Sequence, residues 1–221
     1  MNGAIFKYYP RKESDDYLFD SGTVPDPDFC SNISDGMRLP VWSICGVYHR
    51  RDIEPEGGMI FFVPARKRWA VTELDDYYCT GVLVTGSKID TMDHFLRDSR
   101  FTQKYLEGYR LELTHPDDTE ITRRLRMQNI IVGNPIKSVW FGRNNVRLRP
   151  LLEELGLRQS QELDRINRAI SRLSNEESKK LYDQLVTRIG RRPCPMDGGQ
   201  PPGIPKASAV RDCSCTEDEN C

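Results

Sequence analysis

The chain has 221 residues and a formal net charge of −1, with 38% hydrophobic and 29% charged residues. This length fits one domain with appendages or two small domains, and the composition is polar for a globular protein without being that of a disordered one. No run of about 18 apolar residues occurs, which excludes a membrane-spanning helix, and we expect no secretory signal. We therefore expect a cytoplasmic protein in which Cys30, Cys45 and Cys79 are reduced thiols.

Short apolar runs separated by turn signals dominate residues 3–149. We predict strands over residues 3–10, 41–48, 59–63, 77–85, 129–135 and 138–141. Thr91 is a good N-cap and predicts a helix that begins there, and residues 102–114 continue as a short helical or extended piece. Gly81, within a predicted strand, indicates a bulge or a close backbone approach. Together these elements predict an α+β fold, a small strand-rich barrel or half-barrel with one or two helices.

The chain changes character at Pro150. Three leucines predict a short helix that ends at Gly156, and an apolar stripe over residues 163–173 predicts a helix of about four turns. Ser174 and Glu177 form a capping-box pattern at the start of a further helix. Residues 191–221 are rich in Pro, Gly, Ser and acids, which is typical of disorder. We therefore divide the chain into a strand-rich domain (1–149), a helical hairpin (150–190) and a disordered tail (191–221).

The charges are distributed unevenly along the chain. Residues 121–152 contain seven Lys or Arg and no Asp or Glu, whereas residues 13–35 contain seven acids and no Lys or Arg. Because clustered positive charge attracts polyanions, this layout predicts an anionic partner, either a nucleic acid or a nucleotide.

Aromatic residues accompany the basic segment. Trp140 and Phe141 directly precede Arg143, Asn144 and Asn145; rings of this kind stack on unpaired bases, and Arg and Asn pair with phosphates or base edges. In the alternative interpretation, Val139 and Phe141 face the core and the following residues form an ordinary turn. The candidate nucleic-acid-binding residues are Arg50, Arg51, Tyr78, Arg123, Arg124, Arg126, Lys137, Trp140, Arg143, Asn144, Arg147 and Arg149.

Signals for metal or covalent chemistry are weak. Cys213 and Cys215 lack the spacing of a zinc knuckle, and no phosphate-binding loop, dinucleotide turn or nucleophile elbow occurs. Cys45 and His49 share a strand face but would lie about 13 Å apart. No metal or cofactor is therefore predicted.

Several segments in order resemble the second family of nucleotide-modification-associated domains of bacteria and phages. These are residues 22–29 (GTVPDPDF), the predicted strand 43–51 that ends in two arginines, residues 57–64 (GGMIFFVP), residues 91–101 and residues 138–143 (SVWFGR). The chain departs from the family at Gly58, where members tend to carry Asp, and at Asp26, where they tend to carry Asn. The arrangement is also similar to the PUA-like barrel superfamily, which includes ASCH- and EVE-type domains. That resemblance implies recognition or processing of a modified base.

We therefore expect a nucleic-acid or modified-base binding protein associated with base modification. Two alternatives remain open at the level of sequence. The first is an enzyme that modifies or hydrolyses a base or nucleotide, with His49 or Asp26 as an acid–base group. The second is an interaction module in which residues 158–190 dimerise or dock a protein partner.

Overall fold

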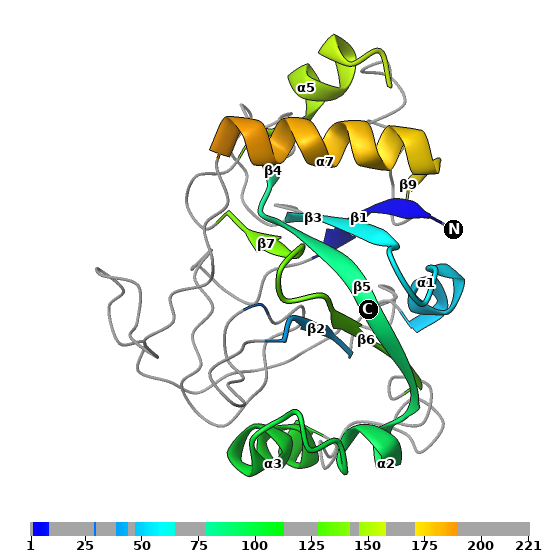
Figure 1. Ribbon diagram of the computed structural model, residues 1–221, viewed down its shortest axis with the longest axis vertical. Helices are drawn as coiled ribbons and strands as arrows, with labels where there is room; N and C mark the ends of the chain where they lie inside the picture. The colour runs from blue at the N-terminus through cyan, green and yellow to red at the C-terminus, as the bar shows by residue number, and fades with distance from the viewer. Residues whose placement is uncertain are drawn as a thin grey trace, which may run out of the picture.

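A bent seven-stranded sheet forms the centre of the described part of the chain (Figure 1). The computed structural model describes residues 2–8, 29, 39–43, 47–64, 78–112, 128–141, 146–157 and 171–189. The strands of the sheet are β1 (Gly3–Tyr8), β2 (Val41–Trp42), β3 (Met59–Pro64), β5 (Gly81–Thr91), β6 (Gln128–Gly133), β7 (Val139–Trp140) and β9 (Ser171–Leu173). Their order is β2-β6-β5-β3-β1-β9, with β7 paired to β5, and β4 (Tyr78–Cys79) and β8 (Val146–Arg147) form a separate pair.

Five helices accompany the strands in the described residues. They are α1 (Val47–Asp52), α2 (Met92–Phe95), α3 (Gln103–Glu112), α5 (Leu148–Glu154) and α7 (Asn175–Ile189). The predicted α+β class is therefore confirmed, with an open sheet. None of the described helices is long and apolar enough to cross a membrane.

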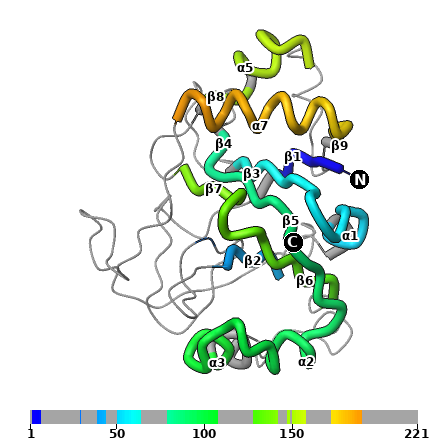
Figure 2. Tube along the Cα trace, viewed as in Figure 1, coloured from blue at the N-terminus to red at the C-terminus, as the bar shows by residue number. Residues whose placement is uncertain are grey.

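Strand β5 joins two halves of the sheet. Its first residues pair with β3, the later ones pair with β6, and the register shifts between Thr85 and Ser87. At Gly86, between them, an added Cβ would lie 3.1 Å from the backbone nitrogen of Asn134, so the chain passes close to β6 at this point. The path of β5 past both halves is visible in Figure 2.

The bend brings together strands that are not neighbours in the sheet. The ring of Trp42, on β2, lies 4.7 Å from that of Phe6 on β1 and 5.4 Å from that of Phe62 on β3. All three side chains are buried. Ile53, Ile60, Leu83 and Ile131 belong to the same cluster. The inner side of the bent sheet is therefore an aromatic core.

Helices cover the outer sides of the two halves. Leucines of α5 and α7 share a buried cluster with Phe61 and Val82, and Figure 1 shows α7 lying between the sheet and α5. At the other end, α2 and α3 pack Phe95 and Leu106 against Ile130 of β6. The described helices of residues 150–190 thus share a core with the strand-rich region.

The local signals for helix ends are confirmed. Thr91 Oγ1 accepts a hydrogen bond from the backbone nitrogen of His94 at 3.3 Å, and Gly156 has a φ of 64° just beyond α5. At the start of α7, the Ser174 nitrogen donates to the Glu177 carboxylate at 2.7 Å and the Glu177 nitrogen donates to Ser174 Oγ at 3.2 Å. These reciprocal bonds satisfy two backbone donors that a helix start otherwise leaves unpaired.

Two predicted elements are wrong. The strand predicted over residues 41–48 ends at Trp42, and helix α1 begins at Val47, because a short apolar run satisfies either period. The helix predicted through Leu173 is replaced at its end by β9, which pairs antiparallel with β1. There Leu173 is buried and Arg172 exposed, as the alternation of a strand requires. The rest of that predicted helix (158–170) and the tail (191–221) lie outside the described residues.

Glycine at position 3 allows α7 to approach β1 closely. A Cβ added there would collide with the side chain of Ser178, which is buried and donates a hydrogen bond to the Ser174 carbonyl at 2.7 Å. The next nearest atom, Leu173 Cβ, would lie at an ordinary contact distance of 3.4 Å. The helix–strand spacing therefore depends on this pair of small residues.

We predict that Gly3→Ala lowers the free energy of unfolding by about 1–3 kcal/mol, the usual cost of overpacking. In a Ser178→Gly background the same change should cost less, because the colliding atoms are gone. Urea unfolding of the four proteins of this cycle tests the contact. An equal cost of Gly3→Ala in both backgrounds would show that the helix does not rest on this position.

Candidate functional site

The segment from Gln128 to Arg147 runs antiparallel beside the segment from Tyr78 to Thr91. Thr91 lies opposite Gln128, Gly81 opposite Trp140, and Tyr78 opposite Arg147. Residues 134–138 leave this pairing as a turn, and residues 142–145 lie outside the described part. Of the basic and aromatic residues singled out in the sequence, Trp140 and Arg147 are therefore held by direct pairing with β5 and β4.

The 134–138 turn is held by two of its own side chains, by the backbone of β5 and by one side chain of α7. Asn134 Oδ1 accepts hydrogen bonds from the backbone nitrogens of Ile136 and Lys137, each at 3.0 Å. Ser138 Oγ accepts from the nitrogen of Val84 at 3.0 Å, and Tyr182 of α7 donates its hydroxyl to the Lys137 carbonyl at 2.6 Å. The turn thus presents Ile136 and Lys137 outward from a fixed backbone, and both are exposed.

The predicted recognition residues Arg143 and Asn144 belong to residues 142–145, which lie outside the described part. The flanks of this segment are well defined. The nitrogen of Phe141 donates to the Thr80 carbonyl at 2.9 Å, and Val146 lies opposite Cys79. Because Thr80 and Cys79 are consecutive, Phe141 and Val146 are both held where β4 passes into β5.

Trp140 follows the 134–138 turn on β7, and its ring packs against Phe29 and Gly81. Its ring centroid is 5.3 Å from that of Phe29 at an interplanar angle of 32°, and a Cβ at Gly81 would approach its ring to 2.9 Å. Val139 and Phe141 are buried in the opposite core, as the alternative interpretation predicted, whereas Trp140 is only half-buried. Gly81 therefore marks a close approach, which confirms the reading of that glycine.

The rings form a path from the interior to Trp140. The ring centroids of Phe62 and Phe29 are 5.8 Å apart, and Phe29 in turn contacts Trp140. Trp140 is the outermost ring of this path among the described residues.

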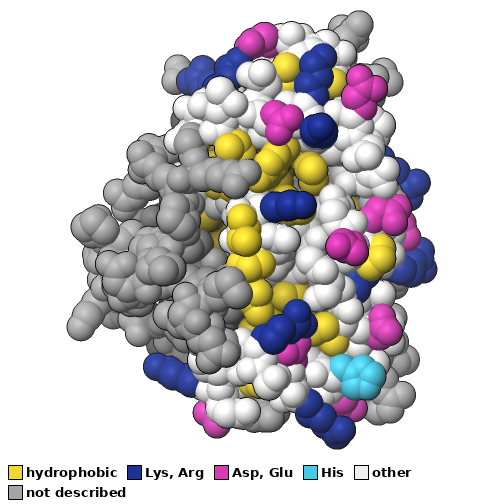
Figure 3. Space-filling view, viewed as in Figure 1, with side chains coloured by type: hydrophobic (Ala, Val, Ile, Leu, Met, Phe, Trp, Pro, Cys, Tyr) yellow, Lys and Arg dark blue, Asp and Glu magenta, His cyan; other side chains and the backbone are white. Residues whose placement is uncertain are grey.

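Positive charge prevails along these paired segments, in which Asp90, near the end of β5, is the one acid. Residues 77–89 and 128–152 contain no Asp or Glu, and their five basic residues are Lys88, Lys137, Arg143, Arg147 and Arg149. Lys137 and Arg147 are exposed on either side of Trp140 in the sequence. Figure 3 shows hydrophobic side chains in a band across the middle of one face, with Lys and Arg side chains among them.

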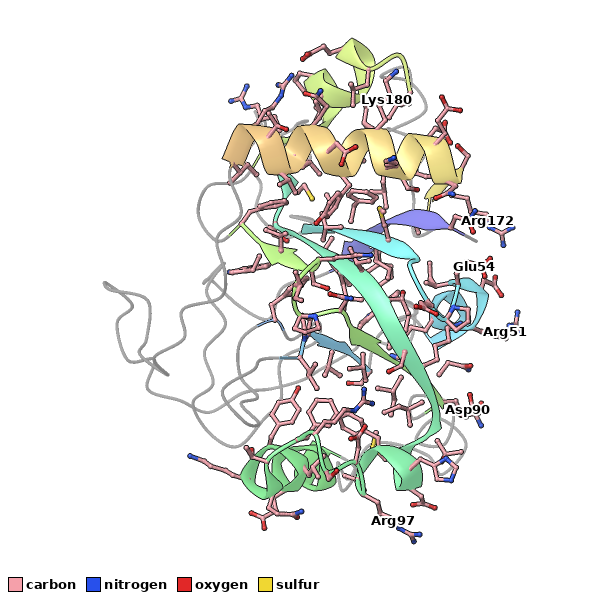
Figure 4. The ribbon with its side chains drawn as sticks, in the orientation of Figure 1. Arg51, Glu54, Asp90, Arg97, Arg172 and Lys180 are labelled. Atoms are coloured by element: carbon pink, nitrogen blue, oxygen red, sulfur yellow. The ribbon has the colours of Figure 1, made fainter. Side chains whose placement is uncertain are left out.

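Arg50 and Arg51 do not join this group. Arg50 is buried, donates from Nη2 to the Gln128 carbonyl at 2.9 Å, and holds its guanidinium carbon 5.9 Å from the Trp42 ring centroid. Of the candidate nucleic-acid-binding residues, Arg50 is therefore not at the surface, because α1 turns this side chain into the core instead of ending a strand. Arg51 is exposed on the side of α1, 3.3 Å from Asp52 and away from β4, as Figure 4 shows.

The remaining candidates are placed only in part. The backbones of Tyr78 and Arg149 are described in β4 and α5, without their side chains. Arg123, Arg124 and Arg126 lie outside the described residues. Sequence reasoning missed Ile136 and Tyr182. Tyr182 lies 45 residues after Lys137, to whose carbonyl it donates, and nothing in the local sequence indicates that this helix anchors the turn.

Other ionisable groups in the described part support structure. Lys88 Nζ donates to the Arg51 carbonyl at 2.8 Å near the end of α1, and burial lowers the pKa of this lysine. Asp98 contacts Arg100. Partial burial acts to raise the pKa of the Asp98 carboxyl, but the hydrogen bonds from Arg100 outweigh this effect and lower it. Both contacts stabilise segment ends and lie outside the Trp140 region.

Neither metal binding nor thiol chemistry is supported by the described residues. They contain no group of three or more His, Cys, Asp or Glu that could hold a metal ion. Cys79 is a free, buried thiol, and burial raises its pKa to about 12, so it stays protonated and unreactive near neutral pH. The side chains of the Cys45–His49 pair lie outside the described part.

Comparison with known proteins identifies no relative: no family model, curated protein or solved structure matches the chain.

We predict that Gly81→Ala displaces the Trp140 ring, because the new Cβ would meet this ring, the Phe29 ring and the Val139 carbonyl at 2.9–3.1 Å. The measurement is the chemical shift of the Trp140 indole in a spectrum of labelled tryptophan, assigned with Trp140→Phe.

Gly156→Ala is the control. The backbone φ of 64° at this position strains any residue with a side chain, but an added Cβ there would have no atom within 4 Å to displace. The substitution should lower stability and leave the Trp140 signal in place. An unshifted Trp140 signal in Gly81→Ala would contradict the packing of this ring on β5.

Proposed function

We propose that the protein binds nucleic acid along the edge formed by β7, β8 and the 134–138 turn, in association with base modification. One observation carries the proposal. The half-buried Trp140 lies in the sequence between exposed Lys137 and Arg147, on a segment that contains no acid, and β7 and β8 of this segment pair with residues 78–82, which also contain none.

The two charges and the ring have separate tasks. Lys and Arg neutralise backbone phosphates and position a nucleic acid without reading its sequence. A ring held at a fixed angle offers a face for stacking, worth about 1–3 kcal/mol for each base. Because Gly81 and Phe29 already fix Trp140, little of that stacking energy is lost in ordering the side chain.

The bend of the sheet is the second support. Its inner side is lined by Phe6, Trp42 and Phe62, and Trp140 lies at the outer end of the same ring path. We propose that this curved sheet is a half-barrel of the kind suggested by the resemblance to base-modification domains and PUA-like barrels. In that case the base rests against Trp140, at the outer end of the aromatic core. The modified-base preference follows from the resemblance alone.

Binding to short labelled single- and double-stranded oligonucleotides, followed by anisotropy at several salt concentrations, tests the proposal. Trp140→Ala should weaken binding about 5- to 150-fold, the equivalent of about 1–3 kcal/mol. Arg147→Gln should weaken binding to all sequences and reduce the slope of log affinity against log salt by about one.

Arg51→Gln is the matched control, because it removes the same charge from the α1 side of the molecule. It should leave the salt slope unchanged. The proposal fails if Trp140→Ala binds like the unmodified chain, or if Arg147→Gln and Arg51→Gln have equal effects.

A further inference from the structure

Ile136 is the only large hydrophobic side chain that is strongly exposed in the described part of the chain, at 72% of its full accessibility. It occupies the 134–138 turn, directly before Lys137 and four residues before Trp140. Single exposed hydrophobic residues are common on protein surfaces and by themselves indicate nothing. The surroundings of this one distinguish it.

The backbone under Ile136 is fixed from several directions. The Asn134 side chain accepts from the Ile136 and Lys137 nitrogens, and the Ser138 nitrogen donates to the Asn134 carbonyl at 2.9 Å. Tyr182 reaches from α7 to the carbonyl of Lys137. A turn tied in this way cannot fold its apolar tip back onto the protein without losing several hydrogen bonds.

The chain around the tip carries positive charge and no acid. Lys137 is adjacent, and the nearest acid along the chain in the C-terminal direction is Glu153. A cation beside an exposed apolar side chain suits a partner with two properties. One is a phosphate backbone for the cation, and the other is an apolar space between stacked layers for the side chain. Stacked base pairs have both properties.

We propose that the ligand of this edge is duplex DNA and that Ile136 inserts as a wedge between adjacent base pairs. The inference rests on the proposed function and specifies its substrate class. Apolar side chains, isoleucine among them, partially unstack base steps and kink the duplex, and the resulting bend widens the contact with the protein. Lys137 then neutralises a phosphate beside the opened step, and Asn134 and Tyr182 keep the wedge from yielding.

The experiment compares Ile136→Ser and Ile136→Leu, both at an exposed position where neither substitution should affect folding. Each protein is titrated onto a duplex that contains 2-aminopurine, whose fluorescence rises when a base step is unstacked. The chain with Ile136 should produce this rise. Ile136→Ser should abolish it and weaken duplex binding about 10-fold while single-strand binding stays the same, and Ile136→Leu should retain both properties.

Three results would overturn the wedge. In the first, Ile136→Ser leaves duplex binding and fluorescence unchanged while Trp140→Ala still weakens binding. The nucleic-acid proposal then stands and only the wedge fails. Another is an equal loss of single- and double-stranded binding. The third is a loss, in Ile136→Ser, of binding to vesicles of phosphatidylserine with no change in duplex binding, which would assign the exposed isoleucine to a lipid surface. If the unmodified chain binds no oligonucleotide at all, the proposed function itself fails.

Discussion

The bend in β5 is the constraint on which the rest of the described structure depends. One strand pairs with β3 over its first residues and with β6 over its last ones, so the sheet must turn where Gly86 passes the backbone of Asn134. That turn brings Trp42 onto Phe6 and Phe62, from strands that share no hydrogen bonds with β2. Both outer sides are then left to be covered by helices, α5 and α7 on one half and α2 and α3 on the other.

The same strand organises the candidate site. The described residues 128–133, 139–140 and 146–147 pair with β5 and β4, so the 134–138 turn and the Trp140 ring share this support. Gly81 lets the Trp140 ring approach β5 closely, and Tyr182 ties the 134–138 turn to α7. The site is therefore built on strands and a long helix, which hold functional groups more rigidly than loops alone.

Features that depend on local interactions could be predicted from the sequence. The caps at Thr91 and Ser174, the glycine that ends α5 and the buried strand of residues 59–63 all follow from neighbouring residues. Residues 41–48 were wrongly predicted as one strand, because a short apolar run fits a strand and a helix equally and nothing local indicates that Arg50 is buried beside Trp42. β9 depends on the distant edge of β1, which no local pattern specifies. Within the site, the sequence indicated the ring and its charges, while the exposure of Ile136 depends on long-range hydrogen bonds.

The central claim is that the two halves of the sheet face each other across a shared aromatic layer. Nuclear Overhauser effects in the labelled full chain measure this directly. The account predicts cross-peaks from the Trp42 indole protons to the ring protons of both Phe6 and Phe62, whose centroids lie 4.7 and 5.4 Å away. A spectrum in which Trp42 shows contacts to β6 and none to either phenylalanine would mean that the sheet is not bent in this way, and the path of rings that ends at Trp140 would be lost with it.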